Sequence, residues 1–259
     1  KTKKQKAIAA TCAVAFWLLV WHVVSLCVGS ELVLVSPVKV VQTLFTVIFD
    51  PDFLKTVWYS AARILGGFFT ALTLGTVLGW VASRFWVVET LLRPITAAIK
   101  ATPVASFIIL VLLWFSGKNL SVIISMLMVF PVIYMNVLEG IRSADEELLE
   151  MAQVFRLSVS KKLLYIYLPA VAPFFVSACS VSLGLCWKSG IAAEVIGTPD
   201  GSIGAVFYQA KIFLQTSELL AWTVVVVAVS VAFEKLFMLL LRLVLKKLKM
   251  EDVLNGKRA

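Results

Sequence analysis

Residues 150–169 read EMAQVFRLSVSKKLLYIYLP, a polar and amphipathic stretch that lies between two long apolar runs. The chain around this stretch has 259 residues, of which 61% are hydrophobic and only 15% are charged. Such a composition excludes an ordinary soluble domain and is typical of a helical membrane protein. A bundle that only crosses a membrane does not need a long amphipathic insertion, so the stretch indicates contact with something outside the bilayer.

Six segments are apolar and long enough to cross about 30 Å of hydrocarbon, which takes about 20 helical residues. We therefore predict an all-α, polytopic membrane protein with a single domain over residues 1–259. Ser36-Pro37 should begin a short amphipathic helix over residues 37–49 that packs along the outer interface. The six predicted spans cover residues 7–29, 64–82, 95–115, 119–138, 163–187 and 219–241.

Basic residues predict the orientation, because Lys and Arg gather in the cytoplasmic loops of membrane proteins. With the N-terminus inside, sixteen of the 24 Lys and Arg residues fall on inner segments and five on outer segments. Both termini should then be cytoplasmic, and the longest inner loop should cover residues 139–165. The net charge of +9 therefore reflects membrane topology and does not indicate nucleic-acid binding.

Small residues recur every fourth position in the second predicted span. Such a stripe lets two helix backbones approach closely where lipid supplies no hydrophobic driving force. The stripe could contact a second subunit or a neighbouring helix of the same bundle, and we favour the neighbouring helix. Its members are Gly67, Ala71, Gly75 and Gly79.

The long inner loop should contain an amphipathic helix. Ser143 and Glu146 have the spacing of a capping box, so this helix should begin near Ala144. The acids of residues 145–150 make lipid an unfavourable cover for the helix, because the inner leaflet is anionic. A groove on a soluble protein fits better. The predicted apolar face consists of Leu148, Met151, Ala152 and Phe155.

This loop resembles the EAA loop of ABC importer permeases, with the spacing of the family pattern kept throughout. Two residues depart from the pattern. Met151 stands where the family has a second alanine, and Arg156 stands at the usual glycine, which allows a sharp turn between two short helices. The positions aligned with the family pattern are Glu150, Met151, Ala152, Arg156, Ile166, Leu168 and Pro169.

Other segments, in order, resemble nitrate/sulfonate/taurine-type permeases over roughly residues 30–245. They include Ser60–Arg63, Leu92–Pro94 and Ala192–Glu194. The resemblance implies a type I ABC importer permease fold, like that of the methionine and molybdate importers, with six transmembrane helices. It also implies a bacterial cytoplasmic membrane, a second permease copy, two cytoplasmic ATPase subunits and an extracytoplasmic binding protein. We favour a homodimer, because nothing marks the chain as half of an asymmetric pair.

The resemblance further implies how the chain is driven. The sequence has no GxxxxGK[ST] phosphate-binding loop, so ATP and Mg²⁺ should bind to the partner ATPases, and the chain should be neither an enzyme nor the holder of a cofactor. The expected ATPase contacts are Glu150, Met151, Ala152, Phe155 and Arg156. The residues expected to set the angle at which the loop enters the fifth span are Ile166, Leu168 and Pro169.

Three charged residues are candidates for the translocation path or its gate: Arg63, Lys188 and Glu194. Glu194, expected just after the fifth span, could line the path or gate its outer end with Lys188, or it could fix the bundle by pairing with Arg63 or by capping a helix. Lys100 should snorkel towards the inner side. The resembled family suggests a small anion or a vitamin precursor as the substrate, delivered by the binding protein.

The sequence also bears on three other classes of protein. An ATP-independent secondary transporter or channel subunit is the main alternative, but it would not need the inner amphipathic loop. A membrane enzyme is disfavoured because the single histidine, His22, leaves little general-base chemistry. A scaffold subunit is disfavoured by the ordered set of permease-like segments. The four cysteines lie in apolar runs without metal-binding spacing, so no metal site is expected.

Overall fold

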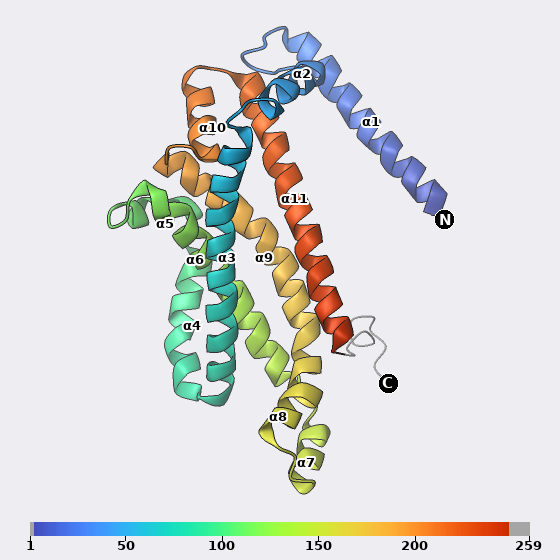
Figure 1. Cartoon of the computed structure of the whole chain (residues 1–259), viewed down its shortest axis with the longest axis vertical. Helices are drawn as coiled ribbons and strands as arrows, with labels where there is room; N and C mark the ends of the chain where they lie inside the picture. The colour runs from blue at the N-terminus through green and yellow to red at the C-terminus, as the bar shows by residue number, and fades with distance from the viewer. Residues whose placement is uncertain (1–2, 249–259) are drawn as a thin grey trace.

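The computed structural model describes residues 3–248, and every regular element in that range is a helix, as predicted (Figure 1). Four of the predicted inner basic residues, Lys1, Lys249, Lys257 and Arg258, lie outside the described residues. The helices are α1 (Lys3–Val28), α2 (Pro37–Ile48), α3 (Phe53–Arg84), α4 (Trp86–Ala101), α5 (Val104–Leu112), α6 (Gly117–Arg142), α7 (Glu146–Val154), α8 (Val159–Lys162), the π-helical η1 (Leu163–Tyr167), α9 (Leu168–Gly197), α10 (Ile203–Ile212) and α11 (Thr216–Lys247).

Helices α3, α6 and α9 form the centre of the bundle and carry most of the main buried cluster. Phe68 of α3, Ile133 of α6 and Trp187 of α9 are among its largest members, and each is almost fully buried. Between membrane helices such side chains stabilise the bundle through close van der Waals packing, because lipid tails are as apolar as the side chains themselves. The centre of the bundle is therefore an apolar core shared by three long helices.

The stripe of small residues on α3 packs against α6. A Cβ atom added at Gly67 would lie 2.4 Å from the carbonyl oxygen of Val122, and one at Gly75 would lie 2.9 Å from Ile133. Ala71, between the two glycines, is fully buried. The prediction that this stripe contacts a helix of the same bundle is confirmed, and close backbone approach is its physical reason.

The predicted span 95–115 is wrong as a continuous helix. The chain breaks between α4 and α5, and the two helices meet at an angle of 106°. Thr102 is extended, with φ −85° and ψ 133°, because the following Pro103 disfavours the helical conformation and lacks a backbone N–H. Five other runs are long and apolar enough to cross a membrane, and the bent α4–α5 pair would make the sixth.

Several helices extend beyond the predicted apolar spans. Helix α3 begins at Phe53 instead of residue 64, because its first turns contain polar residues that lower the local hydropathy. Helix α9 continues to Gly197, so Lys188 and Glu194 lie within a helix and not after one. Hydropathy finds the apolar part of a helix, whereas backbone hydrogen bonding continues through polar turns.

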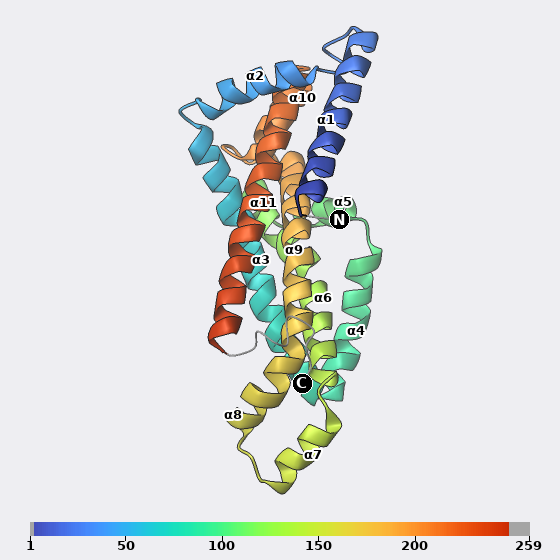
Figure 2. The same ribbon diagram turned by 90° about the vertical axis from the view of Figure 1, so that its right-hand side faces the viewer.

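The molecule has two distinct ends (Figures 1 and 2). At one end, α7 and α8 project beyond the bundle, near the turn between α3 and α4. We call this the hairpin end. At the opposite end, α2 lies across α11, and Ser36 caps α2 by accepting a hydrogen bond from the Lys39 N–H at 3.4 Å, as predicted. Helix α1 diverges from the rest of the bundle and packs mainly against α2.

Candidate functional site

The projecting segment at residues 145–167, here called the hairpin, consists of α7, a turn, α8 and η1. Helix α7 begins two residues later than the capping-box pattern predicts, at Glu146 instead of Ala144. Asp145 is its N-cap and accepts a hydrogen bond from the Glu147 N–H at 2.9 Å, whereas the Ser143 hydroxyl donates to the Gly140 carbonyl. Asp is as good an N-cap as Ser, so the sequence offered two candidate N-caps, and the helix begins after the second of them.

The turn after α7 is built around Arg156, which has a left-handed backbone with φ 47°. The Leu157 N–H donates to the Ala152 carbonyl at 2.9 Å, and the Arg156 N–H donates to the Gln153 carbonyl at 3.0 Å. These two bonds form a Schellman motif, in which the left-handed residue is usually glycine. The sharp turn is therefore kept although arginine stands at the usual glycine position.

One side of the hairpin closes on itself. Ala152 is fully buried and clusters with Ala144 and Ile166, while Leu149 and Leu157 pack at the edge of this small core. Ala152 was predicted to lie on the partner-facing stripe. The structure places it on the inner side of the hairpin, because a small side chain is needed where α7 approaches η1.

The other side of α7 is exposed and largely apolar. Leu148, Met151 and Phe155 lie on it, as predicted, and the Phe155 side chain is 71% exposed. Val154, 79% exposed, also lies on this surface and was missed, although helical periodicity could have found it from Met151. Glu150 is exposed nearby. The hairpin thus exposes apolar side chains beside acidic ones, and none of the described residues packs over these apolar side chains.

The root of the hairpin is the π-helical turn η1. The Leu168 N–H bonds to the Leu163 carbonyl five residues earlier, which widens the helix by one residue per turn. Pro169 follows in the first turn of α9, where a missing N–H costs little. Ile166 is buried, and Leu168 and Pro169 are partly buried. These residues anchor the hairpin to the bundle.

Glu194 connects three helices in the buried interior. It is fully buried in α9, and its Oε2 atom accepts hydrogen bonds from the Ser60 hydroxyl at 2.6 Å and the Gly204 N–H at 3.3 Å. The Ile203 N–H in turn donates to the Ser60 hydroxyl at 2.9 Å. Ser121 lies close enough to interact electrostatically, but its hydroxyl and Glu194 Oε1 form no well-shaped hydrogen bond within the described chain. Glu194 therefore ties α3 and α9 to the start of α10.

The other two path candidates make no direct contact with Glu194, although Arg63 lies near enough for its charge to act on the Glu194 carboxyl group. Arg63 donates to the Lys118 carbonyl and lies over the Tyr59 ring at 4.5 Å, so the Arg63–Glu194 ion pair considered from the sequence is not formed. Lys188 is exposed beside an apolar cavity of about 430 Å³ between α9, α10 and α11. The structure therefore does not gather Arg63, Lys188 and Glu194 into one site.

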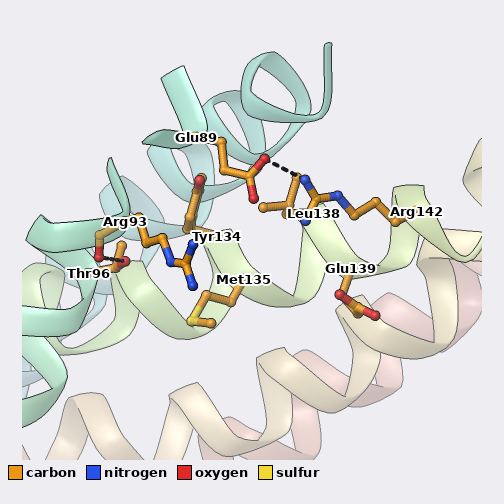
Figure 3. Close-up of a pocket in the computed structure, with 8 residues that line it drawn as sticks. All are labelled: Glu89, Arg93, Thr96, Tyr134, Met135, Leu138, Glu139 and Arg142. Carbon is orange, nitrogen blue, oxygen red and sulfur yellow. Dashed lines mark hydrogen bonds and ion pairs between the residues drawn. The ribbon is translucent and has the colours of Figure 1, made fainter. Parts of the chain in front are cut away.

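A charged cavity of about 390 Å³, here called the crevice, lies instead between α4 and α6 (Figure 3). Glu89 and Arg142 form an ion pair across it at 2.5 Å. The sequence did not reveal the crevice, because residues as far apart as Glu89 and Arg142, 53 positions from each other in the chain, are brought together only by the fold. Its lining residues are Glu89, Arg93, Thr96, Tyr134, Met135, Leu138, Glu139 and Arg142.

Within residues 3–248, no group of three or more His, Cys, Asp or Glu side chains is arranged so that it could hold a metal ion. All four cysteines are free, and Cys179 and Cys186 are buried. Buried thiols of this kind pack as small hydrophobic groups.

Comparisons with known proteins identify the class. The family model of binding-protein-dependent transport system inner membrane components matches residues 71–250. A Bacillus subtilis protein that carries the name aliphatic sulfonates transport permease protein SsuC is 29% identical over 88% of this chain and 83% of its own length. The Escherichia coli taurine transport system permease protein TauC is 27% identical over 83% and 80%. The Synechocystis nitrate import permease protein NrtB is 25% identical over 78% and 76%.

The fold is similar to that of a solved structure, the crystal structure of an amino acid ABC transporter with histidines. The match has a TM-score of 0.53 at 16% identity and covers 75% of this chain and 96% of that chain. The family model and the relatives show that the chain is a permease subunit of an ABC importer, and its fold is the type I importer fold. The chain belongs to the family of binding-protein-dependent transport system inner membrane components.

Proposed function

We propose that the chain lines the translocation path of an importer for a small anion and is driven through its hairpin by a cytoplasmic ATPase. Two copies of the chain, two ATPase subunits and an extracytoplasmic binding protein would make the complete transporter. The hairpin carries this proposal, because it is a folded and capped unit with an uncovered apolar surface beside acids. Mechanical coupling needs such a unit, since a flexible loop would absorb the movement of the ATPase.

A soluble partner fits the exposed surface of the hairpin better than lipid does. The hairpin projects beyond the end of the bundle that the long helices form (Figure 2). Its acidic residues would face an anionic inner leaflet at an energetic cost. In our proposal Glu150, Met151, Phe155 and Arg156 contact the ATPase. Ala152 supports that surface from inside the hairpin.

The orientation follows from the same proposal. The hairpin end would be cytoplasmic, and the charge distribution supports this because most Lys and Arg residues fall on that side of the predicted spans. Both termini would then be cytoplasmic. Arg63, Lys188 and Glu194 lie towards the opposite end, and we propose that they shape the outer gate without binding substrate together.

The proposed substrate is a small oxyanion. The names of the relatives concern sulfonates, taurine and nitrate, and all three ligands carry an anionic group with several oxygen atoms. This favours a small anion over the vitamin precursor that the sequence left open. ATP and Mg²⁺ would bind only to the partner ATPase, because this chain contains no phosphate-binding loop sequence.

The experiment compares Phe155→Asp with Phe49→Asp in the complete transporter reconstituted into vesicles. Phe155→Asp should abolish ATP-driven uptake and substrate-stimulated ATP hydrolysis while membrane insertion is kept, because a carboxylate cannot enter an apolar groove. Phe49 is a matched control, since it is 81% exposed at the opposite end and directly precedes Asp50. That variant should retain both activities.

Two outcomes would contradict the proposal. Unchanged coupling in Phe155→Asp would remove the hairpin from the ATPase interface. Uptake by the purified chain without an ATPase would instead support the alternative, an ATP-independent secondary transporter or channel.

A further inference from the structure

A second charged cavity lies where the hairpin meets the bundle. It has a volume of about 480 Å³ and is here called the root cavity. The ends of α3 and α6 form one side of it, and α7, α8 and η1 form the other. Ile141 of α6 is buried at its wall, and the rings of Trp80 and Tyr167 pack edge to face with their centroids 5.5 Å apart. Five elements thus shape the root cavity.

The root cavity is cationic. Arg84 and Lys162 line it, and none of its lining residues is acidic, although α7 carries three glutamates. Neither basic side chain forms a hydrogen bond or an ion pair with another of residues 3–248. Lys162 is only partly exposed. A charged group that has lost part of its hydration without gaining a partner is unfavourable, so the root cavity fits an anionic ligand.

The root cavity lies at the level where two apolar spans end. The span formed by α3 ends at Arg84, and the span that continues through α9 begins at Val159. Both residues line the root cavity, together with Trp80 and Tyr167. Trp and Tyr are enriched at the membrane–water interface, and basic pockets between helices bind anionic headgroups there. The depth of the root cavity is therefore that of lipid headgroups.

The root cavity and the exposed apolar surface of the hairpin lie on opposite sides of α7. Leu149 and Gln153 line the cavity, whereas Met151 lies on the exposed surface. Two positions along an α-helix correspond to a rotation of about 200°. A soluble partner that covers Met151 therefore leaves the cavity side of α7 facing the bundle.

We propose that the root cavity binds the headgroup of an anionic phospholipid. The Arg84 guanidinium holds two phosphate oxygens in its planar fork, and the Lys162 ammonium binds the phosphate as a second point of positive charge. The acyl chains run along α3, where Val77 and Leu74 are exposed on the side of the helix towards the middle of the span from Trp80. The site requires neither the proposed substrate nor the proposed ATPase contact.

The test measures the preference of the full chain for phosphatidylglycerol over phosphatidylcholine. Native mass spectrometry of the protein in detergent gives the dissociation constant for each lipid, and the preference is their ratio. We expect the wild type to prefer phosphatidylglycerol. Arg84→Gln and Lys162→Gln should each lower the preference about fivefold, the contribution of one basic residue near a headgroup. Lys162→Arg should keep the preference, because the charge remains.

Lys161→Gln is the matched control. Lys161 is adjacent to Lys162 and has the same charge, but it does not line the root cavity. Its replacement should leave the preference unchanged. Equal losses in Lys161→Gln and Lys162→Gln would show a diffuse attraction of lipid to a basic surface and overturn the site. A wild type without any preference for phosphatidylglycerol would also overturn it.

Two competition measurements separate the lipid from other anionic ligands. Inorganic phosphate at millimolar concentration should not displace phosphatidylglycerol, because it lacks the acyl chains. Displacement would assign the root cavity to a soluble phosphate and overturn the lipid site. The preference should also persist in the complete transporter, and its loss there would assign the cavity to an acidic segment of the ATPase. The proposed function is judged separately by the Phe155→Asp and Phe49→Asp pair.

Discussion

Arg156 carries the least favourable backbone conformation of the hairpin. A left-handed conformation costs a non-glycine residue roughly 1–2 kcal/mol, whereas glycine adopts it freely. The two Schellman hydrogen bonds hold Arg156 in this conformation, so contacts in the hairpin offset its unfavourable conformational free energy. Arginine fits at this position because its side chain is exposed, and in our proposal it contacts the ATPase.

We expect Arg156→Gly to stabilise the turn by about 1 kcal/mol and Arg156→Val to destabilise it, because a β-branched side chain fits this backbone worst. Hydrogen exchange of the Leu157 N–H, which is bonded to the Ala152 carbonyl, measures the effect directly. Exchange should slow about fivefold in the glycine variant. Faster exchange in the glycine variant would show that the arginine side chain itself holds the turn. Loss of uptake with slower exchange would show a side-chain contact with the ATPase.

Glu194 allows a second prediction at the level of single residues. Glu194→Ala leaves the Ser60 hydroxyl and the Gly204 N–H without their acceptor in a buried place, which costs on the order of 3 kcal/mol. Glu194→Gln keeps an acceptor oxygen and the side-chain shape. We therefore expect a much lower Tm for the alanine variant and a nearly unchanged Tm for the glutamine variant. Equal Tm values would show that Glu194 does not hold α10 in place.

At the level of helices, five of the predicted spans coincide with long apolar helices, and the sixth coincides with the bent α4–α5 pair. Hydropathy gave neither the full lengths of the helices nor this bend. The break at Pro103 was missed because apolar residues continue on both sides of it, so a hydropathy window sees one span. The hairpin was predictable, since its periodicity, acids and spacing are local. The buried position of Ala152 depends on Ile166, and the crevice depends on α4 meeting α6. Local sequence patterns do not predict contacts between residues that are far apart in the chain.

The close contact of α3 with α6 gives a prediction for the pair of helices. Gly75→Ala would push a methyl group against Ile133, whereas Gly66→Ala on the same helix meets open space. The first variant should lose about 1–3 kcal/mol of stability, and the second should gain about 0.5–1 kcal/mol from helix propensity. Thermal unfolding of the purified chain in detergent measures both. A stabilised Gly75→Ala variant would mean that α3 and α6 can separate without cost.

For the whole molecule, the distribution of burial shows which surfaces remain to be covered. The apolar windows of α1 and α11 are almost entirely unburied within the chain, whereas α6 is more than half buried. Helices this apolar and this exposed require lipid or another subunit around them. The hairpin surface differs, because its apolar residues alternate with acids and lie beyond the spans (Figure 1). The two kinds of exposed surface therefore call for two kinds of neighbour.

The orientation of the whole molecule gives the last prediction. If the hairpin end is cytoplasmic, Val154→Cys should react with a membrane-impermeant thiol reagent in inside-out vesicles and not in right-side-out vesicles. Val154 suits this measurement because it is 79% exposed. Phe49→Cys at the opposite end should show the reverse pattern and controls for vesicle sidedness. The physical reason is the excess of Lys and Arg on the hairpin side, which resists transfer across the membrane. Labelling of Val154→Cys from the outside would put the hairpin beyond the reach of any ATPase, and the coupling mechanism would have to be abandoned.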